Sequence, residues 1–187
     1  MLGRVIYYRQ RERESKYHIQ GDVTKVLKDG WDLMIGHPPC THLSVSGARW
    51  FKKKRKRQAK ALEFFLTLLN CSIPHIALEN PVSVVSSRIR KCDQIIHPWQ
   101  FGHGETKTTC LWLKNLPRLK PTNVVEGRND RVHRLFHTMR GHTLNDLRKE
   151  RSRTYQGIAD AMADQWGKCM NYFTGFGLNV KCQIMDR

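Results

Sequence analysis

One short stretch limits what this chain can fold into more than any other: an apolar run that stops at two prolines and a cysteine. Residues 32–36 (DLMIG) have the length of a buried strand, and His37-Pro38-Pro39-Cys40 follows directly. Proline donates no N–H and fixes φ, so a sheet ladder ends there. In open α/β sheets, ligands bind beyond the carboxyl ends of the strands. The stretch therefore predicts an α/β fold with the Cys40 thiol at its functional edge, although a lone cysteine is also typical of a small buried core residue.

The charge balance points to a polyanionic partner. The 187 residues contain 33 Lys and Arg against 16 Asp and Glu, which gives a formal net charge of +17. A solubilising basic surface is the alternative, but so large a charge favours nucleic acid, and nucleic acid before a membrane surface. With 40% hydrophobic residues, the chain is expected to form one globular domain and to act as a monomer.

Cysteine usage and the N-terminal residues predict a cytoplasmic protein. The six cysteines form no CxxC pair and no close Cys/His pair, so no metal site is predicted. Residues 1–16 contain no apolar core of signal-peptide length, and no run is long enough to span a bilayer. Reduced thiols and no membrane contact are therefore expected.

A second strand, expected over residues 75–78, ends in Glu79-Asn80-Pro81, and the helical pattern of residues 58–70 separates it from the first strand. This is the pattern of a βαβ unit, whose strand ends lie at one edge of the sheet. Further elements are expected as strands over 5–8, 17–20, 110–113 and 179–185, helical turns over 23–28, a helix over 158–166, and a flexible loop over 41–47.

A run of six cations follows the Cys40 loop. A solvated helix face or a localisation signal is the ordinary interpretation of such a run. Its place directly after the candidate site favours contact with phosphates. The predicted nucleic-acid-binding residues are Arg49, Lys52, Lys53, Lys54, Arg55, Lys56, Arg57 and Lys107.

Four motifs, in this order, resemble the DNA cytosine-5 methyltransferase superfamily, in particular its small phage and prophage forms. They are HPPCTHLS, ALENP, QFGHGETKTTCLWL and RSRTYQGIADAMADQWG, and the resemblance covers residues 17–167. It implies a Rossmann-like sheet with helices on both faces, in a single methyltransferase-like domain over residues 1–187. It also implies S-adenosylmethionine as cofactor, DNA as substrate, and the cytoplasm of a bacterium or of a phage-infected host cell as the location.

The resemblance assigns roles to individual residues. It implies that Cys40 is the nucleophile, that Glu79 grips the target base and that Asp22 contacts the adenine of the cofactor. Pro38, Pro39 and Gly157 are implied to lie beside the cofactor. Cytosine carbon 5 is too electron-poor to take a methyl group unaided, but a thiolate that adds to carbon 6 makes the ring nucleophilic. A carboxyl group at ring nitrogen 3 and the exocyclic amine then stabilises the developing charge.

The sequence also departs from the family pattern. The family's Gly-rich turn after the first strand is missing, since no glycine lies between Gly3 and Gly21, and the cofactor-binding part is therefore expected to be N-terminally incomplete. Lys107 stands where the family has an arginine, and Gly157 precedes Ile158 instead of an asparagine. Only the basic, loop-like residues 118–150 are left for target recognition. Two alternatives follow: a catalytically inactive, DNA-binding remnant of the same fold, and a base-modifying enzyme with another one-carbon donor.

Overall fold

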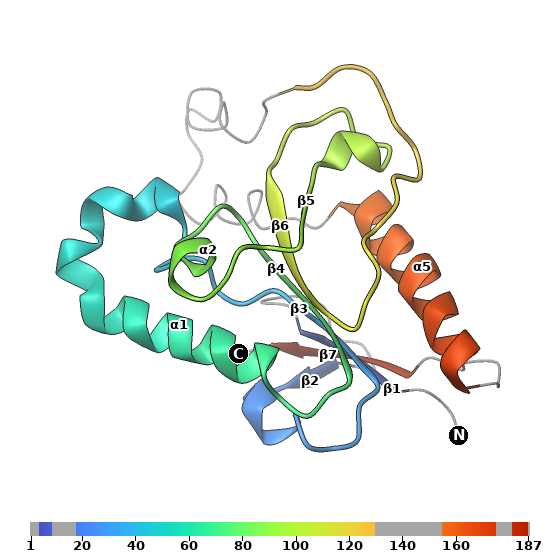
Figure 1. Cartoon of the computed structure of the whole chain (residues 1–187), viewed down its shortest axis with the longest axis horizontal. Helices are drawn as coiled ribbons and strands as arrows, with labels where there is room; N and C mark the ends of the chain where they lie inside the picture. Colours follow the sequence, from blue (N-terminus) through green and yellow to red (C-terminus); the bar gives the residue numbers. More distant parts are fainter. Residues whose placement is uncertain (1–3, 9–17, 130–154, 175–180, 187) are drawn as a thin grey trace. The chain divides into compact units, whose positions relative to one another are not determined.

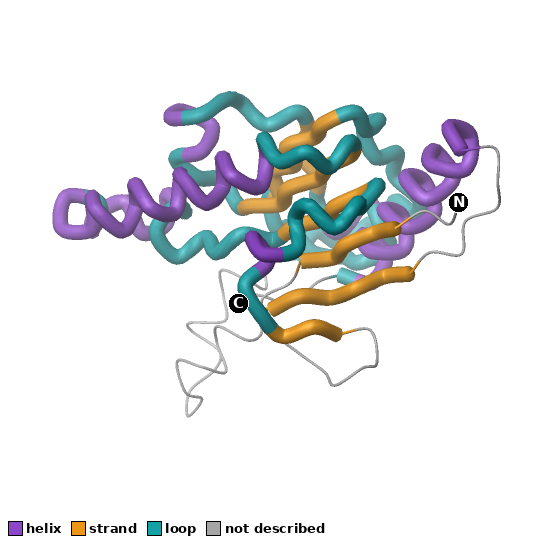
Figure 2. Tube along the Cα trace, turned by 90° about the horizontal axis from the view of Figure 1, so that it is seen from below, coloured by secondary structure: helices purple, strands orange, loops and turns teal. Residues whose placement is uncertain are grey.

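The computed structural model describes residues 4–8, 18–129, 155–174 and 181–186. They form an α/β fold around a mixed sheet with strand order β2-β7-β1-β3-β4-β6-β5 (Figures 1 and 2). The pairs from β2 to β4 along this order are parallel, and β6 runs antiparallel to β4. The strands are β1 Arg4–Tyr8, β2 His18–Gln20, β3 Leu33–Gly36, β4 His75–Asn80, β5 Gln94–Ile96, β6 Thr109–Lys114 and β7 Lys181–Asp186. The predicted α/β class is confirmed at this level.

The apolar run before the two prolines forms β3, and all four residues of this strand are buried. Its parallel register with β4 pairs Leu33 with His75 and Gly36 with Leu78. Side chains alternate between the two faces of a strand, so Met34 and Ile76 share one face and Ile35 and Ala77 share the other. Residues of both faces are buried, as expected for a parallel core that is covered on both sides.

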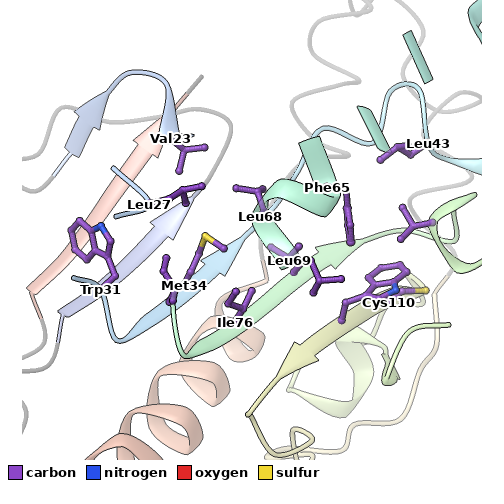
Figure 3. Close-up of a cluster of buried hydrophobic side chains, with 14 residues drawn as sticks. Val23, Leu27, Trp31, Met34, Leu43, Phe65, Leu68, Leu69, Ile76 and Cys110 are labelled. Carbon is purple, nitrogen blue, oxygen red and sulfur yellow. The ribbon is translucent and has the colours of Figure 1, made fainter. Parts of the chain in front are cut away.

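Helix α1 (Arg55–Leu69) connects β3 to β4 and covers one face of the sheet. Its buried side chains Phe65, Leu68 and Leu69 pack on the core cluster around Met34 and Ile76 (Figure 3). Phe65 also contacts Trp112 of β6 edge to face, with ring centroids 5.2 Å apart. The predicted βαβ unit is therefore present.

The observed helices differ from the predicted ones at their boundaries. Helix α1 begins at Arg55 instead of residue 58, so half of the cation run lies in its first turn. Helix α5 (Gln156–Thr174) is longer than predicted. The segment after β4, for which no helix or strand is expected above, contains the short helix α2 (Val85–Arg88) and β5. Three short 3-10 helices flank β3 along the chain: η1 (Val23–Lys25) precedes it, and η2 (Val45–Trp50) and η3 (Lys52–Lys54) follow it.

The chain divides into two compact units. Unit 1 consists of Met1–Ile95, Thr109–Arg118 and Cys169–Arg187, and unit 2 of Ile96–Thr108 and Leu119–Lys168. Unit 1 holds the core cluster of Figure 3. Unit 2 holds the 3-10 helix η4 (Pro98–Gln100) and the first part of α5. Within the segment 118–150, residues up to 129 are extended or looped, and the rest lies outside the described residues. The single catalytic domain remains a prediction.

Candidate active site

The two strands that carry the candidate residues end side by side. Strands β3 and β4 are adjacent and parallel, so their carboxyl ends lie at the same edge of the sheet (Figure 1). One step beyond the last pair, Gly36 with Leu78, the register brings His37 next to Glu79 on the same face. Cys40 lies three residues farther along, after the Pro-Pro elbow, and is exposed. The structure thus brings the two predicted catalytic residues to one edge.

Glu79 is held by an ion pair that the sequence did not reveal. Its Oε2 lies 2.8 Å from Nδ1 of His37, and the two side chains are 21% and 17% exposed. The contact forms whether the imidazole is protonated or is neutral with its proton on Nδ1. One carboxylate oxygen is therefore fixed by a neighbour on the adjacent strand, which orients the whole group.

Asn80 fastens the elbow to the sheet. Its Nδ2 donates a hydrogen bond of 2.9 Å to the carbonyl of Pro38, and the side chain is only 1% exposed. Asn80 points to the face opposite Glu79, because successive strand residues alternate. Two consecutive residues of β4 thus have different roles: Glu79 presents a carboxylate, and Asn80 fixes the backbone that leads to Cys40.

The loop after Cys40 is bound to the loop after β4. The carbonyl of Cys40 accepts hydrogen bonds from the N–H groups of Leu43 and Ser44, which closes a turn. The N–H of Val45 then donates to Val82, and the N–H of Val84 donates to Leu43. Leu43 is fully buried, and the Ser44 side chain caps η2. The segment 41–47, predicted to be a flexible loop, therefore contains a buried leucine and the start of a capped 3-10 helix, neither of which is visible as a periodic pattern in the sequence.

Positive charge is concentrated beside this loop. Most of the cation run is exposed, on η3 and the first turn of α1, and no Asp or Glu lies between Asp32 and Glu63. Cations at a helix N-terminus oppose the helix dipole, at a cost of about 0.3–1 kcal/mol each at low ionic strength. The first turn of α1 contains no acidic residue and its N-cap makes no side-chain hydrogen bond. The run thus reduces the stability of its own helix.

Two groups near the edge have perturbed pKa values. Burial, with added repulsion from Lys54 and Arg57, lowers the pKa of His42, so this histidine is uncharged at neutral pH and cannot stabilise a thiolate. Burial, together with Cys92 and Glu79, raises the pKa of Cys110 to about 12, so that thiol is unreactive.

The predicted cofactor residues lie in different places. Asp22 follows β2. Strand β2 is parallel to β7, β7 to β1 and β1 to β3, so the carboxyl end of β2, and with it Asp22, lies at the same edge of the sheet as Cys40. Its Oδ1 accepts hydrogen bonds from the N–H and hydroxyl of Thr24, at 3.0 and 2.8 Å, and caps η1. Pro38 is buried and Pro39 half-buried in the elbow.

Lys107 and Gly157 belong to unit 2, whereas Cys40 and Glu79 belong to unit 1. The Lys107 ammonium lies 5.6 Å from the ring centroid of Tyr155, within unit 2. A side chain at Gly157 would collide with the carbonyl oxygen of Phe101, which gives this glycine a packing role. The binding roles of Lys107 and Gly157 remain predictions.

Three features of this region were not predicted from the sequence: the bond from Asn80 to the elbow, the pairing of His37 with Glu79, and the position of Trp50 beside the cation run. The Asn-Pro that ends β4 and the aromatic next to the cations were the available signals. Pairing across strands that lie about forty residues apart depends on register, which no local pattern specifies.

A scan against protein-family models finds no match to this sequence, and a search of curated proteins finds no significant match. Among the helices that the structure describes, none is long and apolar enough to cross a membrane. Within the same residues, no group of three or more His, Cys, Asp or Glu side chains is placed to hold a metal ion. The geometry of the edge therefore carries the functional argument: an exposed thiol, an oriented carboxylate and a cationic surface.

Proposed function

We propose that this chain is a DNA cytosine-5 methyltransferase-like protein. The observation that carries the proposal is the juxtaposition of two strand ends, one leading to the exposed Cys40 and the other presenting Glu79 in its ion pair with His37. A nucleophilic thiol and a carboxyl group are the two groups that activation of a cytosine ring requires. The cation run supplies the phosphate contacts that hold the strand while the base leaves the duplex.

In the proposed reaction, the Cys40 thiolate adds to carbon 6 of cytosine, which forms a C–S bond and moves an electron pair to carbon 5. A proton held between Glu79 and ring nitrogen 3 neutralises the charge that develops on the ring, and the Glu79 carboxyl group accepts a hydrogen bond from the exocyclic amine. Carbon 5 then takes an electrophile, loses its original proton, and the C–S bond breaks to release the thiolate. S-adenosylmethionine, the proposed cofactor, supplies an electrophilic methyl group when bound.

The fit of the described residues to S-adenosylmethionine is partial. The carboxylate of Asp22, at the shared sheet edge, is chemically suited to accept a hydrogen bond from the adenine amine. The methionine part has no matching Gly-rich turn, because the segment that follows β1 contains no glycine before Gly21. This missing turn favours a second candidate function, a DNA-binding protein of the same fold without methyl transfer.

One experiment separates the two candidates without depending on the cofactor. Addition of a thiolate to carbon 6 makes carbon 5 basic, so hydrogen at that position exchanges with solvent even when no methyl donor is present. We expect the protein to release tritium from DNA that carries 5-³H-cytosine. Cys40→Ala should abolish the release, and Glu79→Gln should slow it by about a hundredfold or more.

The matched control is Cys71→Ser, since Cys71 lies before the amino end of β4, at the opposite end of that strand from Glu79. It should release tritium like the unmodified protein. DNA binding without any tritium release would refute the proposed chemistry and support the DNA-binding alternative. Calorimetric titration with S-adenosylmethionine, with and without DNA, then tests the cofactor separately.

A further inference from the structure

Trp50 is a large aromatic side chain on the surface, in the midst of positive charge. It ends η2 and is 45% exposed. The guanidinium carbon of Arg49 lies 5.3 Å from the ring centroid, and Nζ of Lys53 lies 5.8 Å from it. A single exposed apolar side chain is ordinary on a protein surface, but this ring lies between two cations.

The surroundings of Trp50 define the chemistry of a partner. We use the term basic–aromatic surface for Arg49, Trp50, Lys52 and Lys53 together with residues 55–57. All of these residues are exposed, and no acidic residue interrupts the chain between Asp32 and Glu63. An acidic protein would satisfy the cations but would leave the indole ring without a planar partner. Single-stranded nucleic acid satisfies both, because its phosphates neutralise cations while its bases stack on aromatic rings.

The basic–aromatic surface is joined to the loop that begins at Cys40 both by a hydrogen bond and by the continuous chain. Gln58, one residue beyond the cation run, donates a hydrogen bond of 3.1 Å from its side chain to the carbonyl of His42, in the loop that begins at Cys40. Helix η2 continues that loop directly to Trp50. A base held by Trp50 would thus be attached to the same ordered segment that carries the nucleophile.

We propose that Trp50 is a stacking platform for an unpaired DNA base, with the cations of the basic–aromatic surface on the flanking phosphates. The protein accordingly binds single-stranded or locally opened DNA in preference to closed duplex, where every base is already stacked. This inference deepens the proposed function and rests on it only in taking DNA as the partner. It requires no methyl transfer.

The test compares binding of fluorescein-labelled oligo(dT) and of a closed hairpin duplex, by anisotropy, at several salt concentrations. Trp50→Ala should weaken oligo(dT) binding by about tenfold or more, since stacking on an aromatic ring is lost. The slope of log K against log salt should stay unchanged, because no cation is removed. Trp50→Phe keeps an aromatic face and should retain binding within about threefold.

The matched control is Val45→Ala, which trims an exposed apolar side chain of the same 3-10 helix, 46% exposed. It should leave both affinities unchanged. Stacking should also quench tryptophan emission on addition of oligo(dT), and Trp50→Phe should remove the quenching while binding persists.

The outcomes separate the platform from the proposed function. If Trp50→Ala binds oligo(dT) as tightly as the unmodified protein, or weakens oligo(dT) and duplex equally, the platform is refuted and the proposed function stands. If Trp50→Ala selectively weakens oligo(dT) while tritium release from cytosine is absent, the platform stands and the proposed chemistry fails. A protein that binds neither DNA refutes both.

Discussion

The ion pair between His37 and Glu79 should contribute measurably to both stability and chemistry. Exposed ion pairs contribute about 0.2–1 kcal/mol, and hydrogen bonds to charged groups about 1.5–3 kcal/mol. These side chains are about four-fifths buried and 2.8 Å apart, so the pair lies between the two classes. We expect a coupling energy of about 1–2 kcal/mol.

A double-mutant cycle of His37→Ala, Glu79→Ala and the double variant measures this coupling by urea unfolding, followed by circular dichroism and tryptophan fluorescence. Loss of His37 also frees the carboxylate to rotate, and His37→Ala should slow tritium release from cytosine by about five- to thirtyfold. His37→Asn places an amide donor near the position of Nδ1 and should restore much of the rate. A coupling below about 0.3 kcal/mol, within the error of additivity, would refute the reasoning. Full activity of His37→Ala would equally show that the carboxylate needs no such support.

Three other predictions follow from the same edge. Asn80→Ala leaves the buried carbonyl of Pro38 without its donor and should lower the free energy of unfolding, measured by urea titration, by about 1–3 kcal/mol. An unchanged urea midpoint would show that this hydrogen bond does not stabilise the elbow. Iodoacetamide at pH 8 should label the exposed Cys40 in the folded protein. Cys110 is buried and its pKa is raised to about 12, so it should be labelled only after unfolding. Peptide mapping identifies the labelled cysteines, and labelling of Cys110 in the folded protein would contradict its burial. Because the pKa of His42 is lowered in the folded protein, the unfolded chain binds a proton more readily, and the contribution of His42 to stability is full above pH 6.5 and falls as the pH drops below it. In thermal melts between pH 7 and pH 5, His42→Gln should therefore lose less stability than the unmodified protein. An identical pH profile would exclude His42 as a contributor.

The sequence alone determined the central βαβ unit and the residue types at its edge. Strand β3 was predictable because an apolar run of strand length meets two prolines, and α1 because its apolar positions recur with helical period. These signals are local, since each depends on residues within one element. For the same reason, Cys40 and Glu79 could be placed after their strands, and parallel strands necessarily end at a common edge.

The tertiary structure alone decided how these residues are held. The pairing of His37 with Glu79 depends on a register between strands that the sequence separates by a whole helix, and a shift of one residue would turn the two side chains to opposite faces. Asn80 was part of a recognisable motif, but its bond to Pro38 is a contact across the sheet. The loop after Cys40 looked flexible because small polar residues carry no periodic signal; burial of Leu43 and hydrogen bonds to the neighbouring loop give it its form. The residue types within each element therefore determine which groups reach the edge of the sheet, whereas long-range packing and strand register determine the geometry of these groups.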